Sequence, residues 1–492
     1  MLESMLAGMS HLLTWSSLAL MSLGMFIGIF FGIVPGISGI TALVILLPFV
    51  TSMEPQTALL LFIGVSAVIP TADVIPAILI GVPGTASAAA TCIDGYQMAR
   101  KGQAARAYGA AYTVSAIGGV IGALFLLATI PVMRPLVMSL GSPELLMLAL
   151  MGLSTVGVIS GRLPLIGLAL GALGLLLGQI GIDPQTGVHR WSFGILYLTD
   201  GLSMQAVVLG LFGVAEIADL AILGSRVSEE IQATGKGLYE GVKDSFRHWG
   251  LTLGSSIIGI IVGIIPGIGA NVASWLGYAY AAQTSKDKEN FGKGDVRGVI
   301  GPEAANNSCM GGALLPTLSF GVPGSSEMVL YLAAFAMLGI IPGPLMLTEH
   351  LDLVFTIAWG VALANILGCL ICMVLTIYLV KLCRVPVRVL APVVIALIFM
   401  GALRISVSFP DLITVIVFGI IGYIFKRLGW PRQSLVLGFI LSPIVGKYLF
   451  ITVNAYGTTW LMRPWVILIA LITIAIAVYG FKARQMAGGR QP

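Results

Sequence analysis

Charged residues are scarce in this sequence. Asp, Glu, Lys and Arg make up 10% of its 492 residues, whereas hydrophobic residues make up 58%. Soluble domains carry about 25% charged residues, so the composition excludes an ordinary water-soluble globular protein. Many windows reach the roughly 20 apolar residues that a helix needs to cross a bilayer. The sequence therefore predicts an all-α protein that crosses the membrane many times, with about 10–14 membrane segments once broken and re-entrant helices are counted.

Recognisable catalytic and metal-binding patterns are also missing. No G-x-x-x-x-G-K-[ST] string occurs, so we expect no ATP-driven motor. The four histidines are scattered without the spacing of a metal site. Of the five cysteines, Cys369 and Cys372 form a C-x-x-C without further ligands, which indicates small apolar residues on a membrane helix. We predict that the chain is not an enzyme and has no cofactor, with sodium as the one candidate ion.

The N-terminal segment lacks the features of a cleaved signal peptide. Residues Met1 to His11 contain no basic stretch and are followed by no small-residue cleavage site. We expect the apolar run at roughly 12–34 to form the first membrane helix instead. At the other end, residues 482–492 are basic and are predicted to form a mobile cytoplasmic tail.

Glycine and proline, by contrast, are abundant, with 62 and 24 copies, and they form two kinds of turn inside apolar stretches. The first kind is Gly32-Ile-Val-Pro-Gly-Ile-Ser-Gly39, which returns as Gly263-Ile-Ile-Pro-Gly-Ile-Gly-Ala-Asn271. The second is Gly81-Val-Pro-Gly-Thr85, which returns as Gly321-Val-Pro-Gly-Ser325. Helix breaks at membrane depth expose backbone groups that lipid cannot satisfy, so they survive only where protein or a water-filled cavity covers them. Such breaks are typical of transport sites.

The order and spacing of the turns predict an internal duplication. Pro266 follows Pro35 by 231 residues, and Pro323 follows Pro83 by 240 residues. A longer loop at 284–298 accounts for the difference. The duplication divides the chain into a first membrane repeat at 1–223, a polar or amphipathic linker at 224–248 and a second membrane repeat at 249–481.

Basic residues predict that the two repeats have inverted topology. The loop after the first turn carries no Lys or Arg in the first half (51–56), whereas its counterpart in the second half (285–297) is basic. After the second turn the pattern reverses, since 94–106 is basic and 341–352 carries no Lys or Arg. Because positive loops tend to face the cytoplasm, equivalent loops are expected on opposite sides of the membrane.

The broken segments favour binding of a small carboxylate. The N-terminus of a half-helix offers free N–H groups and a partial positive charge, so two such ends aimed at one spot form an anion site without any arginine. Thr41, Ser87 and Ser274 are further hydroxyl donors near the turns. The candidate substrate-binding residues are Pro35, Gly36, Ser38, Gly39, Pro83, Gly84, Thr85, Pro266, Gly267, Asn271, Asn306, Asn307, Pro323, Gly324, Ser325 and Ser326.

Three acidic residues near the turns are candidates for ion coupling, because burying a carboxylate at membrane depth is costly and marks function. They are Asp73, Glu303 and Glu327. Unwound carbonyls and hydroxyls close to them can also hold a sodium ion. Alternatives for these residues are an interfacial cap for Asp73 and an N-terminal helix charge for Glu303. For the turns, the alternative is that they are simple kinks joined by Ser and Thr contacts.

These motifs together resemble the large membrane subunit of the tripartite tricarboxylate transporters, the TctA family. The resemblance rests on the four turns, on Asp94-Gly-Tyr-Gln-Met-Ala-Arg100, on Gly181-Ile-Asp-Pro-Gln-Thr-Gly187 and on Pro302-Glu-Ala-Ala-Asn-Asn307, and it covers nearly the whole chain in order. Thr71-Ala72-Asp73 departs from the family pattern, in which a stretch richer in glycine and serine is expected.

The resemblance implies a multi-pass carrier in the bacterial inner membrane, and no nucleic-acid partner. The expected partners are a small four-helix, TctB-like membrane subunit and a periplasmic, TctC-like solute-binding protein that delivers the substrate. The expected substrates are citrate-like tricarboxylates or other small carboxylates, imported with a sodium or proton gradient. An organic-anion channel without ion coupling is the alternative, because inverted repeats with broken helices also line channels. An intramembrane enzyme is weaker, since no paired catalytic residues stand out.

Overall fold

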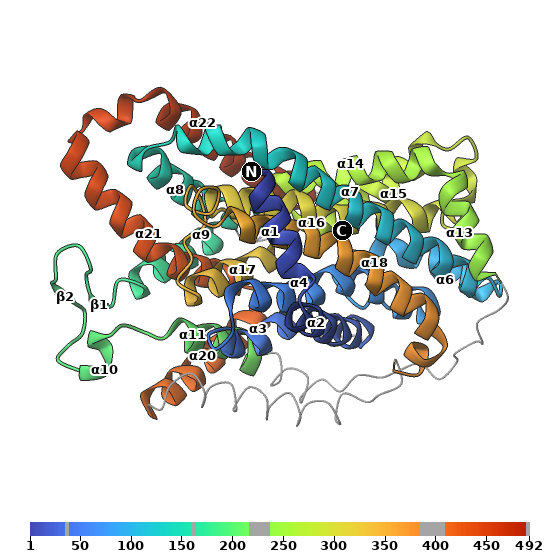
Figure 1. Ribbon diagram of the computed structural model, residues 1–492, viewed down its shortest axis with the longest axis horizontal. Coiled ribbons are helices and arrows are strands. Elements are labelled where there is room, and N and C mark those ends of the chain that lie inside the picture. The colour runs from blue at the N-terminus through green and yellow to red at the C-terminus, as the bar shows by residue number, and fades with distance from the viewer. Residues whose placement is uncertain (35–38, 160–163, 216–236, 383–408, 489–492) are drawn as a thin grey trace.

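The computed structural model describes residues 1–34, 39–159, 164–215, 237–382 and 409–488, and it is almost entirely helical (Figure 1). In the first half the elements are α1 (Leu2–Leu12), α2 (Trp15–Ile33), α3 (Gly39–Val50), α4 (Pro55–Ala72), α5 (Val74–Ile80), the short η1 (Ala86–Ala88), α6 (Ala89–Arg100), α7 (Ala104–Met138), α8 (Ser142–Ile159), α9 (Pro164–Leu177), β1 (Gly181–Ile182), β2 (His189–Arg190), α10 (Leu196–Thr199), α11 (Met204–Val208) and the π-helical η2 (Leu209–Val214).

The second half is likewise helical. Its elements are α13 (Leu238–Arg247), α14 (Trp249–Ile264), α15 (Gly269–Thr284), η3 (Lys288–Asn290), α16 (Arg297–Phe320), α17 (Ser326–Met337), α18 (Leu351–Leu382), α20 (Phe409–Arg427), α21 (Arg432–Tyr456), η4 (Thr459–Met462) and α22 (Pro464–Gly488). The strands β1 and β2 pair in antiparallel fashion, with Gly181 opposite Arg190.

Six helices in the described parts of the chain are long and apolar enough to cross a membrane. They are Trp15–Ile33, Pro55–Ile80, Ala104–Met138, Leu351–Lys381, Phe409–Arg427 and Arg432–Tyr456. The pair α13 and α14, which is bent by 77°, would make a seventh. Several further apolar helices are only 10–17 residues long. The prediction of an all-α membrane protein is confirmed, whereas the number of short segments that enter the bilayer stays a prediction.

In each half, the helix that precedes the first turn packs with its backbone close to the next long helix of the same half. In the first half, a Cβ added at Gly24 of α2 would lie 2.2 Å from the carbonyl oxygen of Leu61 on α4. In the second half, a Cβ at Gly259 of α14 would lie 2.2 Å from the carbonyl oxygen of Ala305 on α16. Small residues at such crossings let helices pack where no hydrophobic effect drives them together. The two helix pairs thereby hold the turns in place.

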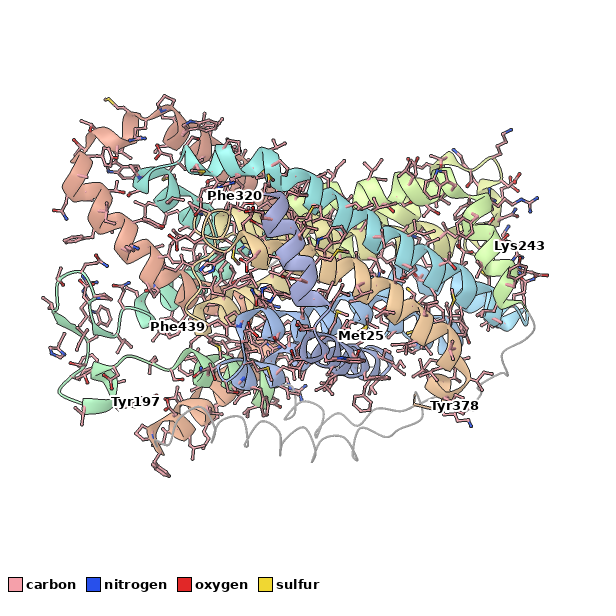
Figure 2. All side chains as sticks on the ribbon, viewed as in Figure 1. Met25, Tyr197, Lys243, Phe320, Tyr378 and Phe439 are labelled. Carbon is pink, nitrogen blue, oxygen red and sulfur yellow. The ribbon has the colours of Figure 1, made fainter. Side chains whose placement is uncertain are left out.

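The two basic loops of the sequence lie together at one end of the molecule. Lys101, which follows α6, donates a hydrogen bond from Nζ to the carbonyl oxygen of Lys293 in the loop before α16. Lys243 of α13 lies at the same end, whereas Tyr197 and the β1–β2 hairpin lie at the opposite end (Figures 1 and 2). The two basic loops therefore lie at the end of the molecule opposite the hairpin.

Asp94 of α6 ties the two basic loops together. Its side chain is fully buried and accepts hydrogen bonds from the backbone N–H groups of Gly294 (2.7 Å) and Asp295 (3.0 Å) and from the hydroxyl of Tyr278 (2.8 Å). The first and second halves are therefore joined at this end by a buried carboxylate.

Replacing Asp94 by Ala is expected to destabilise the protein by about 2–4 kcal/mol, because two backbone donors and one hydroxyl lose a charged acceptor. The measurement is thermal unfolding of the purified protein in detergent, with Asp287→Ala in the neighbouring exposed loop as the control. An Asp94→Ala protein that melts at the wild-type temperature would show that the carboxylate does not hold the two loops.

The structure corrects one boundary that the sequence suggested. The apolar run at 12–34 does not start one helix at residue 12, because α1 ends at Leu12 and α2 begins at Trp15 after the cap residue Thr14, whose side chain accepts a hydrogen bond from the N–H of Ser17 (3.4 Å). The predicted tail at 482–492 begins inside α22, which continues to Gly488, and the division into a separate tail stays a prediction. Part of the predicted linker forms a helix, α13, and residues 224–236 lie outside the described residues.

Candidate functional site

The two turns of the second half are hydrogen-bonded to each other. The N–H of Gly267 donates to the carbonyl oxygen of Gly324 (3.1 Å). Beyond these turns, α15 begins at Gly269 and α17 at Ser326, and neither helix has a side-chain cap at its N-terminus. Both helices therefore start side by side with backbone N–H groups that no side chain caps.

The turns of the first half have the same local backbone as those of the second half. Gly81 and Gly321 are both left-handed, with φ, ψ of 67°, 18° and 68°, 21°. Thr85 and Ser325, four residues further on, are both extended. The residues that end the helices before the other two turns also have matching backbone angles. Val34, after α2, has φ, ψ of −80°, 108°, and Ile265, after α14, has −77°, 111°. Residues Pro35, Gly36 and Ser38 lie outside the described residues.

Residues next to all four turns line one cavity of about 270 Å³. The first half contributes the start of α3, part of α4 and the segment that includes η1, and the second half contributes the starts of α15 and α17 and the middle of α16. The lining residues are Gly39, Ile40, Ser66, Ile69, Pro70, Thr85, Ala86, Ser87, Gly267, Ile268, Gly269, Ala270, Asn271, Asn306, Cys309, Met310, Ala313, Ser325, Ser326, Glu327, Met328 and Gln433.

Half of the described candidate residues line the cavity, and the other half do not. The candidates that line it are Gly39, Thr85, Gly267, Asn271, Asn306, Ser325, Ser326 and Glu327. Those that do not are Asp73, Pro83, Gly84, Pro266, Glu303, Asn307, Pro323 and Gly324. The prolines and Gly84 and Gly324 shape the turns, so their contribution is to the backbone path rather than to the lining.

Asn306 is the most informative lining residue. Its side chain is 1% exposed, yet neither its amide nitrogen nor its carbonyl oxygen has a hydrogen-bond partner. Leaving a buried polar group unpaired costs about 1–3 kcal/mol, so such a group calls for an explanation. A polar ligand in the cavity would satisfy both atoms.

Asn307, the next residue on α16, lies on another face. Its amide nitrogen donates to the hydroxyl of Thr71 (3.1 Å) and to the side-chain oxygen of Asn365 (2.9 Å), which links α16 to α4 and α18. Successive residues on a helix point about 100° apart, and of the two asparagines only Asn306 lines the cavity. The described contacts give Asn307 a role between helices.

Two acidic residues lie fully buried behind the wall. Asp73, between α4 and α5, accepts hydrogen bonds from the hydroxyls of Thr85 and Ser87, and the Ser87 bond measures 3.3 Å. Glu303, in the second turn of α16, accepts a hydrogen bond from the hydroxyl of Thr91. Neither forms an ion pair that the structure records, and one oxygen of each carboxylate has no partner. Asp73 is the N-cap residue of α5 but its side chain makes no cap hydrogen bond, and Glu303 lies beyond the first turn of α16.

Glu327 is the third acidic candidate, and it belongs to the cavity wall itself. It lies in the first turn of α17, where a negative charge is favourable because it faces the positive end of the helix dipole. Among the described residues that line the cavity, none is Lys or Arg. Any anion held here is therefore held by backbone N–H groups, hydroxyls and amides.

Two polar lining residues were not singled out from the sequence. Ser66 lies in the middle of α4, where its hydroxyl contacts that of Tyr331 (3.1 Å), and Gln433 lies in the first turn of α21. A serine in an apolar helix is most often a helix-packing residue. Gln433 follows a basic loop. Neither position carries a sequence signal that separates it from its neighbours.

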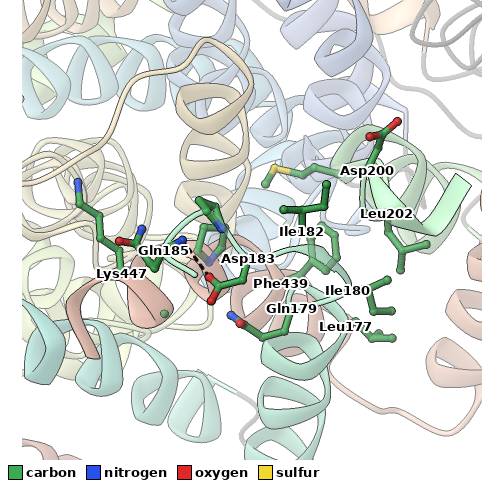
Figure 3. Close-up of a pocket in the computed structure, with 16 residues that line it drawn as sticks. Leu177, Gln179, Ile180, Ile182, Asp183, Gln185, Asp200, Leu202, Phe439 and Lys447 are labelled. Atoms are coloured by element: carbon green, nitrogen blue, oxygen red, sulfur yellow. Dashed lines mark hydrogen bonds between the residues drawn. The ribbon is translucent and has the colours of Figure 1, made fainter. Parts of the chain in front are cut away.

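A second cavity of about 260 Å³ lies beside the β1–β2 hairpin, at the end of the molecule away from the basic loops (Figure 3). Asp183 lines it but is already satisfied, because Thr186 donates to it (2.5 Å) and Arg190 pairs with it (2.6 Å). The Thr186 hydrogen bond, helped by the N–H of Gln185 and by Arg190, holds the pKa of Asp183 below its usual value. Asp200 and Lys447 also line this cavity, whereas only the cavity between the turns is lined by residues beside all four of them.

Comparisons with known proteins agree with the arrangement of the motifs. Residues 18–437 match the model of the tripartite tricarboxylate transporter TctA family. An uncharacterised 52.8 kDa protein of the TAR-I ttuC′ 3′ region in Agrobacterium vitis is 33% identical over 431 residues, which cover 87% of this chain and 85% of the relative. An uncharacterised protein of the TAR-II ttuC′ 3′ region in the same organism is 34% identical over 195 residues, which cover 39% of this chain and 79% of the relative. No solved structure matches the chain.

Proposed function

The chain belongs to the tripartite tricarboxylate transporter TctA family, and we propose that it is the large membrane subunit of a secondary carrier that imports small organic carboxylates. Membership confirms the family resemblance seen in the motifs, and it confirms that the chain is a multi-pass transport protein rather than an enzyme. Substrate, driving ion and partners are the parts of the proposal that need experiment.

The observation that carries the carboxylate proposal is the unpaired Asn306 in a cavity formed by residues from both halves. Three helices, α3, α15 and α17, begin at this cavity, so their backbone N–H groups and partial positive charges favour an anion. This placement supports the proposal that the lining candidates bind the substrate.

Inverted repeats are the second part of the proposal. The matching dihedral angles at Gly81 and Gly321 and at Val34 and Ile265 support a duplication. The hydrogen bond from Lys101 to Lys293 supports the inversion. It joins the loop after the second turn of the first half to the loop after the first turn of the second half, so the loops that share one end of the molecule are not equivalent loops. We propose that this basic end faces the cytoplasm, because positive loops tend to do so. The β1–β2 hairpin then faces the opposite side of the membrane.

The name of the family implies that two further components act with this chain. We propose that they are a small TctB-like membrane subunit and a TctC-like solute-binding protein, which would deliver the carboxylate from the periplasm. The bacterial source of the relatives supports an inner-membrane location.

Reconstitution tests the carrier proposal. Labelled carboxylates should accumulate in proteoliposomes above the outside concentration when a sodium or proton gradient is imposed, and the solute-binding protein should stimulate uptake. Equilibration at the same rate with and without a gradient would instead indicate a channel. Accumulation that persists without any gradient would contradict both.

Asp73→Asn is expected to lower gradient-driven accumulation at least about tenfold, because the amide neither carries a charge nor exchanges a proton. Substrate exchange across equal concentrations should continue, since Asp73 does not line the cavity. The measurement compares accumulation and exchange in one preparation, with Asp200→Asn at the exposed hairpin end as the control. Undiminished accumulation by Asp73→Asn would remove this residue from ion coupling, and loss of exchange would place it in substrate binding.

A further inference from the structure

One face of α13 is fixed against α7. The two backbones meet at a glycine, because a Cβ added at Gly241 would lie 2.0 Å from the carbonyl oxygen of Arg106. Asp244 is buried and pairs with the guanidinium of Arg106 at 2.6 Å. The hydroxyl of Ser245 is also buried and donates to the carbonyl oxygen of Ala110 (3.2 Å). These contacts set the rotation of α13 about its own axis, and they thereby determine which residues occupy its other face.

The other face of α13 carries aromatic and charged side chains together. Tyr239 is 69% exposed and Phe246 is 60% exposed. Lys243 and Arg247, one turn apart, are also exposed, and Nζ of Lys243 lies 4.6 Å from the centre of the Tyr239 ring. Within α13, all of whose residues the structure describes, Glu240 is the one exposed acidic residue. The face therefore has a net positive charge.

The angle between α13 and α14 places this face along the membrane surface. The two helices are bent by 77° relative to each other, and α14 is the apolar member of the pair. Membrane helices are tilted by about 20° from the bilayer normal on average, so an α14 that enters the bilayer leaves α13 nearly parallel to its surface. Figure 2 shows Lys243 at the end of the molecule that also carries the two basic loops.

Neither bulk water nor the hydrocarbon core of a bilayer suits this face. In water, the exposed rings of Phe246 and of Trp249, at the start of α14, would remain hydrated at a cost in free energy. In hydrocarbon, the charges of Lys243 and Arg247 would be costly. The headgroup region accepts both kinds of side chain, because aromatic rings reach the acyl boundary while the long cationic side chains extend to the phosphates.

We infer that the exposed face of α13, formed by Tyr239, Lys243, Phe246 and Arg247, is a binding surface for anionic phospholipid. The rings lie at the acyl boundary, and the two cationic groups bind the lipid phosphate. Charge complementarity selects anionic over zwitterionic lipid, since neither Lys243 nor Arg247 takes part in the ion pairs recorded among the described residues. This inference goes beyond the proposed function, because it requires no particular substrate, driving ion or protein partner.

Photoreactive lipids test the inference on the full-length chain. The protein is placed in phosphatidylcholine nanodiscs that contain a small, equal fraction of phosphatidylglycerol or phosphatidylcholine with a photoreactive acyl chain, and labelling of the peptide that spans α13 is measured by mass spectrometry. We expect about tenfold more labelling by phosphatidylglycerol than by phosphatidylcholine. Equal labelling by the two lipids would overturn the anionic preference. Labelling by neither would place the face in water or against another protein, and it would overturn the inference as a whole.

A matched pair of double variants locates the cause of the preference. Lys243→Gln with Arg247→Gln should lower the ratio of phosphatidylglycerol to phosphatidylcholine labelling at α13 to about twofold or less. Lys286→Gln with Lys288→Gln removes the same charge from an exposed basic loop and should keep the wild-type ratio. A wild-type ratio in the α13 variant, or an equal loss in both variants, would show that α13 itself does not select the lipid. The wild-type comparison stands without either variant, and none of these outcomes bears on carboxylate uptake.

Discussion

Asn306→Ala is expected to weaken carboxylate binding about 10- to 100-fold while leaving membrane insertion unchanged. The asparagine is buried, has no partner in the protein and lines the cavity, so its hydrogen bonds are available only to a ligand. Losing hydrogen bonds to a charged group costs about 1.5–3 kcal/mol, and each 1.4 kcal/mol is a factor of ten in affinity. The measurement is the half-saturating concentration for uptake together with the amount of protein in the membrane.

Two control variants make this result specific. Asn454→Ala changes an exposed asparagine on α21 and should transport normally. Asn307→Ala should instead lower the melting temperature, because it removes hydrogen bonds that link α16 to α4 and α18. Normal affinity in Asn306→Ala would mean that the unpaired amide is not a ligand contact, and the cavity would lose its main support as the substrate site.

Gly84→Ala is expected to abolish transport and to lower the melting temperature by several degrees. A Cβ at this position would lie 2.2 Å from the carbonyl oxygen of Gly32 and 2.9 Å from the Cα of Asp73. Both neighbours are backbone or fixed to it, so the turn that carries Thr85 must move. Overpacking of this kind costs about 1–3 kcal/mol or more, and a displaced Thr85 can no longer meet Asp73.

Gly250→Ala at the start of α14 is the matched control, because an added Cβ there meets no atom within 4 Å. It should match the wild type in melting temperature and in uptake. Wild-type behaviour of Gly84→Ala would show that the turn can move without cost, and it would contradict the tight packing of the turn against α2.

The positions of the turns could be predicted from the sequence because glycine and proline break helices for local reasons. Gly81 and Gly321 end α5 and α16 in the left-handed conformation that glycine adopts freely. The recurrence of the motif then paired the turns, and residues beside each of them line one cavity. Local chemistry therefore sufficed to find the neighbourhood of the candidate site.

The detailed lining could not be predicted in the same way, because it depends on helix rotation and on distant packing. Asn306 and Asn307 are neighbours in sequence, and only the rotation of α16 decides that the first lines the cavity while the second bonds to Asn365. Gln433 reaches the cavity from α21, more than 100 residues after Glu327. No periodicity within the sequence records such a contact.

We propose that the two halves of the chain enclose a single carboxylate site. The most direct test asks whether the substrate protects an introduced cysteine in each half from a thiol reagent. Ala86 and Ala270 both line the cavity and come from different halves, and Ala455 lies exposed on α21 away from it. Each is changed to Cys in turn, and its labelling by a small thiol reagent is mapped by peptide mass spectrometry, which separates it from the native cysteines. We expect the transported carboxylate to protect Ala86→Cys and Ala270→Cys with the same half-maximal concentration and to leave Ala455→Cys unprotected. Protection of only one of the two cavity positions, or of neither, would contradict it.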